Sequence, residues 1–213
     1  HQEAKKQFGT KLSATVAVQL QMAEERLRAF AKWQARQTSD GWVIRYAEQQ
    51  LECNFHDSLG RPLRIRGRID RIDHHQQSGE WRVLDYKTSE KASSPQQTHR
   101  KKGAWIDLQL PLYRLLVNDL RLEGAIRLGY INLPGDLKQV NHRIAEWTTD
   151  DLASADEKAR QVATDIKDLR IESIRAATGG MIKDELARIC QDTVVDRRFP
   201  WLDAWPGRVH SET

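Results

Sequence analysis

The sequence predicts an α/β fold in which a mixed central β-sheet is flanked by α-helices. Three observations lead to this prediction: an amphipathic helical pattern opens the chain, β-prone segments alternate with helical ones after it, and a second amphipathic helix follows the last strand. The 213 residues suffice for one core, so we expect a single domain over residues 1–213, with its centre at about 42–147 and helical parts at 1–38 and 148–213. Because the first residue is not Met, we expect a piece of a longer protein.

Spacing and turn residues locate the individual elements. Apolar side chains recur every three or four positions from residue 1 to about 37, and Ser39-Asp40-Gly41 ends that helix. The polar stretch 89–103 reads as a flexible surface connection. We expect strands at 42–55, 66–73, 81–87, 125–133 and 140–147, and helices at 107–120, from the caps at 148–151 to about 175, and at 183–190, before an aromatic tail.

Charged residues concentrate in the hairpin that residues 66–87 are expected to form. If the chain folds back between Gln77 and Ser78, Asp70 lies opposite Asp85, and Lys87 shares a face with Asp85 because strand side chains alternate. An exposed ladder of ion pairs is the ordinary explanation for such charges. The apolar neighbours in V-L-D-Y-K favour a buried strand instead, where two close carboxylates repel unless a cation lies between them. Oxygen ligands suit Mg²⁺ or Mn²⁺ rather than zinc.

The motifs G-R-I-D-R-I-D, D-Y-K-T and Q-L-P-L-Y, in this order, resemble the RecB-like branch of the PD-(D/E)XK nucleases over about residues 48–120. The resemblance implies a restriction-endonuclease-like fold and a metal-dependent DNA nuclease, an exonuclease of DNA repair or recombination associated with a helicase domain or subunit. A catalytically impaired DNA-binding or scaffolding domain and an RNA-directed phosphodiesterase remain alternatives.

The resemblance also assigns roles to single residues. It makes Asp70 and Asp85 the metal ligands, assisted by the backbone carbonyl of Tyr86, and gives Lys87 the task of orienting or deprotonating water or of stabilising the transition state. Gln109 and Tyr113 match the helix motif that braces the site and touches DNA.

Two further acidic or basic positions follow from the same resemblance. Glu48 stands where members frequently carry a glutamate, and it either completes the acidic cluster or faces solvent. A histidine usually precedes the hairpin as another ligand, but this chain offers only His1, at its terminus, and His56, in a turn.

Composition limits the partners. The formal net charge of +4 permits nucleic-acid binding without requiring it, and we expect phosphate contacts from basic residues beside the hairpin strands, namely Arg68, Arg71, Arg100, Lys101 and Lys102. Two cysteines cannot hold a four-cysteine iron–sulfur cluster, and without a secretory signal we favour reduced thiols over a disulfide. No apolar run reaches the roughly 20 residues of a membrane span. With the resemblance to DNA nucleases, we expect a cytoplasmic, nucleoid-associated protein.

Overall fold

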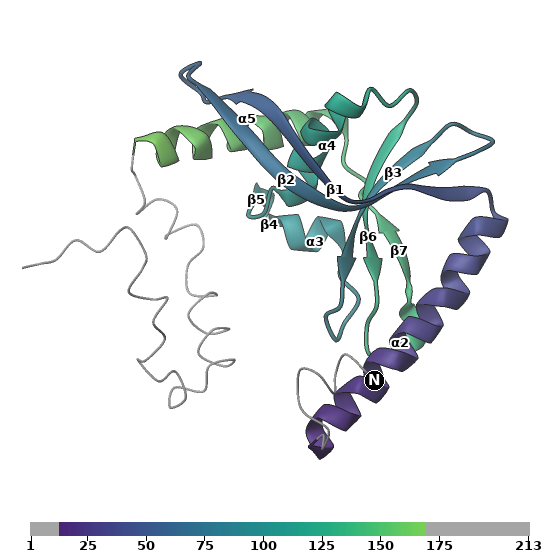
Figure 1. Ribbon diagram of the computed structural model, residues 1–213. Coiled ribbons are helices and arrows are strands. Elements are labelled where there is room, and N and C mark those ends of the chain that lie inside the picture. Colours follow the sequence, from purple (N-terminus) through teal and green to yellow (C-terminus); the bar gives the residue numbers. More distant parts are fainter. Residues whose placement is uncertain (1–12, 169–213) are drawn as a thin grey trace, which may run out of the picture. The chain divides into compact units, whose positions relative to one another are not determined.

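A five-stranded mixed sheet with helices on both faces forms the part of the chain that the computed structural model describes, residues 13–168 (Figure 1). The strands are β1 (Trp42–His56), β2 (Pro62–His75), β3 (Trp81–Lys87), β6 (Ile126–Asn132) and β7 (Asn141–Ile144), in the order β1-β2-β3-β6-β7. β3 and β6 are parallel, and the other neighbours are antiparallel. The predicted α/β class, a mixed sheet flanked by helices, is confirmed.

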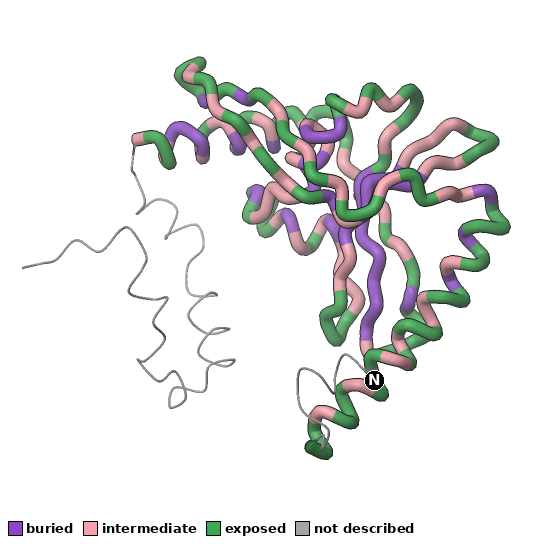
Figure 2. The backbone as a smooth tube through the Cα atoms, viewed as in Figure 1, coloured by how far each residue is buried: buried purple, intermediate pink, exposed green. Residues whose placement is uncertain are grey.

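The β2–β3 hairpin has the register that the sequence predicts. Its ladder pairs His74 with Trp81 and ends at Arg71 with Leu84, so Asp70 is the next residue opposite Asp85. β3 is buried between β2 and β6, which agrees with the apolar neighbours of its charges. Figure 2 shows the buried residues gathered in this central part of the sheet.

One face of the sheet is covered by α4 (Gln109–Leu116), the 3₁₀ turn η1 (Val117–Leu120) and α5 (Thr149–Lys167). Leu110, Leu116 and Val117 pack there against Ile72, Val83 and Leu128 in one apolar cluster. The far end of the long β1–β2 hairpin packs on α5, where Phe55 contacts Ala159 and Ala163. The predicted helix 107–120 therefore exists, but its last turn is 3₁₀.

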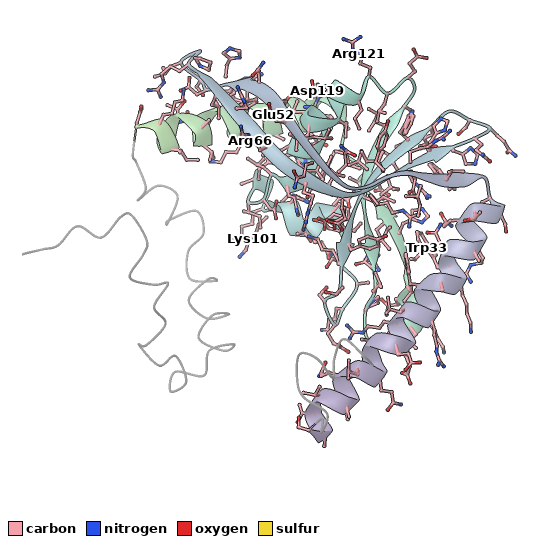
Figure 3. All side chains as sticks on the ribbon, in the orientation of Figure 1. Trp33, Glu52, Arg66, Lys101, Asp119 and Arg121 are labelled. Carbon is pink, nitrogen blue, oxygen red and sulfur yellow. The ribbon has the colours of Figure 1, made fainter. Side chains whose placement is uncertain are left out.

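The other face is covered by α2 (Ala14–Ser39) through Trp33, which packs against Leu84 and Ile131 (Figure 3). Beneath the helix lies a fully buried group of charges. Arg71 and Arg82 both pair with Asp73, at 2.6 Å and 3.3 Å. Gln34 and Gln37 of α2 accept hydrogen bonds from the two guanidinium groups, at 2.6 and 2.9 Å, which ties the helix to the sheet.

The stretch 89–103 differs from the predicted flexible connection. It contains α3 (Pro95–His99), β4 (Arg100–Lys101) and the start of a two-stranded ribbon with β5 (Ala104–Trp105). Pro95 and His99 are buried. Ser94 and Pro95 begin the short helix, as proline at a first helical position allows. Polar composition misled the prediction here because the few buried side chains are polar or small.

The caps of the last helix agree with the sequence. The Thr148 hydroxyl accepts from the Asp151 N–H, and the Asp151 carboxylate accepts from the Thr148 N–H, which makes a capping box. The helix expected at 183–190 and the aromatic tail lie outside the described residues, as does His1.

Candidate active site

On β3, Asp85 and Lys87 lie two and four positions after the buried Val83, so they lie on the same face of the sheet, the one that α4 covers. Asp85 is only 5% exposed. Its Oδ2 lies 2.8 Å from Lys87 Nζ, yet this buried oxygen accepts no hydrogen bond of good angular geometry. Buried polar atoms nearly always have a polar partner, and for Oδ2 the Lys87 ammonium is that partner.

β2 brings Asp70 to the same place, as the hairpin register requires. The Tyr86 N–H donates to Asp70 Oδ2 at 2.9 Å, so this carboxylate is held by the backbone of the residue between Asp85 and Lys87. The Tyr86 carbonyl belongs to the same short segment of β3. Two aspartates and one lysine from two neighbouring strands therefore lie side by side.

An irregularity of the β1–β2 pair lies beside Asp70. Ala47 pairs with Arg71 and Gln49 with Ile69, so Glu48 lies opposite Asp70, and its φ of 52° is left-handed. A left-handed φ is uncommon for a non-glycine residue in a strand, although the register of the pair is the same on both sides of Glu48. The Glu48 carboxylate pairs with Arg68 Nε at 3.0 Å and both side chains are largely exposed. Of the two roles left open for Glu48, its exposure and its pairing favour the solvent-facing one.

α4 contributes Gln109 and Tyr113, one helical turn apart. Gln109 Nε2 donates to Asp85 Oδ1 at 3.1 Å and to the Tyr113 hydroxyl at 3.0 Å, while Gln109 Oε1 accepts from Lys87 Nζ at 3.4 Å. The Tyr113 hydroxyl donates to the Arg68 carbonyl at 3.1 Å. The amide of Gln109 thus joins the acid and the lysine of β3 to the helix.

Electrostatics at the site favour a bound cation. Burial raises the pKa of Asp85, and although the Lys87 ammonium lowers it, the negative charges of Asp70 and Asp107 raise it again. Burial and the Asp85 charge also raise the pKa of Tyr113. A divalent cation between the two aspartates would relieve their repulsion.

The donor set fits a hard cation of the Mg²⁺ type. Within residues 13–168 no group of three or more histidine, cysteine or acidic side chains is arranged to hold a metal. Mg²⁺, however, is commonly bound through one or two carboxylates and keeps several waters, whereas zinc and calcium need fuller protein cages. Asp70 and Asp85, brought opposite each other by the hairpin register, would meet that smaller requirement.

The basic residues expected to contact nucleic acid fall into two groups. Arg71 is 1% exposed and held by Asp73, so the prediction of a phosphate contact for Arg71 is corrected: it is a structural residue beneath α2. Arg68 is exposed, and Lys101 and Lys102 lie exposed at the β4–β5 turn, where Figure 3 labels Lys101. Arg100 is partly engaged, because it pairs with Asp151 and lies over the Trp105 ring.

Sequence reasoning missed three residues next to the site. His99 and Tyr130 are fully buried, and Tyr130 lies under Lys87, with Nζ 4.7 Å from the ring centre. The pKa of Asp107 is lowered: burial raises it, but His99 and the Gln109 N–H outweigh burial, and the Lys87 charge adds a smaller effect in the same direction. Ser94-Pro95, at the start of α3, was the sequence signal for a helix start inside the polar stretch 89–103.

Comparison with known proteins adds one finding. A model of the PD-(D/E)XK nuclease superfamily matches residues 1–192. No curated protein matches the sequence. None of the helices within residues 13–168 has both the length and the hydropathy that a membrane crossing requires.

Proposed function

The chain belongs to the PD-(D/E)XK nuclease superfamily, and from that premise we propose that it is a metal-dependent deoxyribonuclease of the RecB-like type. We propose further that it degrades DNA from ends, in repair or recombination at the nucleoid, together with a helicase domain or subunit. The order of the three motifs supports the RecB-like assignment, since Gln109 and Tyr113 follow the D-Y-K strand as in that branch.

One observation carries the proposal of catalysis. The carboxylate of Asp85 is buried next to the position of Asp70, with the Gln109 amide against Oδ1 and the Lys87 ammonium against Oδ2. Two close carboxylates beside one ammonium keep an excess of negative charge. The convergence of Asp70 and Asp85 therefore suits a divalent cation from outside the protein.

The proposed metal ligands are Asp70, Asp85 and the Tyr86 carbonyl, and the ion is Mg²⁺ or Mn²⁺. When bound, such an ion lowers the pKa of a coordinated water and neutralises phosphate charge. Glu48 is kept only as an outer residue, because it pairs with Arg68 at the edge of the site.

Lys87 supplies positive charge to the reacting phosphate. Its ammonium contacts a carboxylate oxygen of Asp85, the amide oxygen of Gln109 and the face of Tyr130. These three partners suit a cation, so they favour stabilisation of the transition state over proton abstraction. Gln109 and Tyr113 hold Asp85 and the Arg68 segment in place from α4.

The substrate contacts belong to the proposal as well. Arg68 lies two residues before Asp70, and the tip of the β4–β5 ribbon carries Lys101 and Lys102, which are exposed. These side chains offer sequence-independent contacts to a phosphate backbone. Arg100 is a weaker candidate because Asp151 already neutralises it.

A binding module without catalysis is the second candidate. It is favoured by the small donor set, since residues 13–168 supply no third side chain to the metal and the usual upstream histidine has no counterpart there. In that case the site would bind DNA but cut it slowly or not at all.

The test uses the whole chain and end-labelled DNA with Mg²⁺ or Mn²⁺, in linear, circular and single-stranded forms, beside a matched RNA. We expect metal-dependent cutting of linear DNA that Asp85→Asn reduces at least about 100-fold, while Asp119→Asn, an acid outside the site, leaves the rate unchanged. Cutting of circular DNA would reject the exonuclease proposal, and preference for RNA would reject DNA as the substrate. DNA binding without any metal-dependent cutting would select the second candidate.

A further inference from the structure

His99 lies under the active site and uses both ring nitrogens. It is fully buried at the end of α3. Nδ1 lies 2.9 Å from the carbonyl oxygen of Asp107, and Nε2 lies 2.6 Å from the hydroxyl of Tyr130. A proton on Nδ1 donates to the carbonyl and leaves Nε2 free to accept from the hydroxyl, so one tautomer satisfies both contacts.

From His99 two short routes lead to Lys87. On one side, Asp107 Oδ1 lies 3.2 Å from His99 Nδ1 and accepts the N–H of Gln109 at 2.7 Å. Gln109 in turn accepts from Lys87. On the other side, Tyr130 lies with its ring 4.7 Å from Lys87 Nζ. His99 therefore contacts Tyr130 directly and reaches Gln109 through Asp107, and these are two of the three partners of Lys87, the third being Asp85.

His99 also closes the base of the β4–β5 ribbon. Its carbonyl oxygen accepts the N–H of Ile106 at 2.9 Å. This hydrogen bond joins the two ends of the segment 99–106, which carries Lys101 and Lys102. The ribbon is held separately to α5, where Trp105 Nε1 donates to Ser154 Oγ at 2.8 Å. The two contacts differ in one respect, because His99 also bonds to Asp107 and to Tyr130 beside Lys87, whereas the Trp105–Ser154 bond joins the ribbon to α5 alone.

We propose that His99 is a positioning residue for the nuclease reaction. It fixes the start of α4, and thereby Gln109, together with the ring of Tyr130, so that Lys87 is held at its working distance from Asp85. This inference rests on the proposed function, because it assigns the role relative to Lys87. A buried histidine that only fills space would show no such pair of bonds, one to Tyr130 under Lys87 and one to Asp107 at the start of α4.

Three variants separate positioning from folding. His99→Leu removes both hydrogen bonds, whereas His99→Asn keeps a side-chain N–H near the position of Nδ1. Ser154→Ala removes one hydrogen bond between the same ribbon and α5, where the Arg100–Asp151 pair remains, and serves as the control. Single-turnover cleavage rates are divided by the folded fraction from thermal unfolding, and the side-chain amide of Gln109 is followed by ¹H–¹⁵N NMR in the absence of metal.

We expect the rate per folded molecule to fall about 10- to 100-fold in His99→Leu, since displacements near 1 Å have effects of that size. The fall should be smaller in His99→Asn and absent in Ser154→Ala, and the Gln109 resonance should move in the same order. An unchanged rate per folded molecule with an unmoved Gln109 resonance in His99→Leu would overturn the inference. If His99→Leu does not fold, the same two criteria apply to His99→Asn.

The design also distinguishes failure of the inference from failure of the proposed function. If the unaltered chain does not cut DNA, the nuclease proposal fails while the Gln109 resonance still reports whether His99 holds the helix start. A Gln109 resonance that moves equally in Ser154→Ala would likewise overturn the inference, because both contacts would then act alike.

Discussion

At the scale of single residues, Gln109 is the side chain that joins the two elements of the site. It contacts Asp85, Lys87 and Tyr113 together. Tyr113 has fewer links to the reacting groups, since its hydroxyl reaches the Arg68 backbone and the Gln109 amide. The two helix residues should therefore differ in importance, although both belong to one motif.

Replacement of Gln109 by alanine should lower the single-turnover cleavage rate by about 10- to 100-fold, because Lys87 and Asp85 both lose a positioning partner. Tyr113→Phe should lower it by less than about tenfold, as the ring remains in the core. Rates are measured at saturating metal with circular dichroism as the fold control. Equal effects of the two substitutions would contradict this ranking.

Buried and exposed acids on the strands provide a second comparison. Asp73 is fully buried between Arg71 and Arg82, whereas Glu52 pairs with Arg64 and Arg66 at the surface. Burial lowers the pKa of Arg82 to about 10, with Asp73 opposing and Arg71 reinforcing that effect. Loss of the Asp73 charge would leave two buried guanidinium groups uncompensated.

Asp73→Asn should therefore reduce the free energy of unfolding by about 3–5 kcal/mol, and Glu52→Gln by no more than about 1 kcal/mol. Urea denaturation at neutral pH measures both. Similar losses for the two variants would show that the buried group does not hold α2 to the sheet.

At the scale of elements, the contact between β6 and β7 depends on a glycine. A Cβ at Gly129 would lie 2.6 Å from the backbone oxygen of Arg143, and backbone cannot move aside easily. A Cβ at Gly67 would meet the end of the Leu116 side chain at 2.6 Å, which can rotate. The same substitution therefore has different consequences in the two strands.

Gly129→Ala should destabilise the protein by about 1–3 kcal/mol, and more than Gly67→Ala. Thermal unfolding of the two variants tests this order. A larger loss of stability in Gly67→Ala than in Gly129→Ala would contradict this order. It would mean that α4 cannot shift relative to β2.

The packing of β7 against the buried arginines also predicts a pH effect. Burial lowers the pKa of His142, and the Arg82 charge lowers it further, while Asp73 opposes. The folded protein then takes up a proton less readily than the unfolded chain, whose histidine titrates near about 6.5. The stability linked to His142 is complete above that pH and is lost as the pH falls toward the lower folded-state pKa.

Urea midpoints at pH 7.5 and pH 5 should therefore differ more for the unaltered chain than for His142→Asn, with the exposed His56→Asn as control. An unchanged pH dependence in His142→Asn would assign the acid sensitivity to other groups.

Some features of the fold and the site could be predicted from the local sequence, and others could not. The hairpin register follows from its own turn, so the convergence of Asp70 with Asp85 could be predicted without tertiary information. His99 and Arg71 could not be placed, because their burial depends on β6, α4 and α2, which are distant in the chain. Polar composition and strand alternation carry no information about which face a remote helix covers.

At the scale of the whole molecule, a cation bound between Asp70 and Asp85, as proposed, would stabilise the fold by offsetting the repulsion of the two carboxylates. Burial raises the pKa of Asp85 most, and the Asp70 charge raises it further, while the Lys87 ammonium lowers it. An ion that binds only the folded chain stabilises it by mass action. Removal of divalent ions is therefore expected to change stability as well as activity.

Mg²⁺ or Mn²⁺ at ten times its dissociation constant should raise the free energy of unfolding by about 1.4 kcal/mol over the value with a chelator. The melting temperature should rise by a few degrees. Asp70→Asn should abolish that increment, while Glu48→Gln should keep most of it. A melting temperature indifferent to the ions would contradict the assignment of the two aspartates.

The most direct test of the central claim compares Asp85→Asn with Lys87→Ala in one experiment. Mn²⁺ binding, followed by electron paramagnetic resonance, and single-turnover DNA cleavage are measured on the same samples. The account predicts that Asp85→Asn loses both ion binding and cleavage, whereas Lys87→Ala retains ion binding and loses cleavage. Undiminished cleavage by Lys87→Ala, or undiminished Mn²⁺ binding by Asp85→Asn, would contradict it.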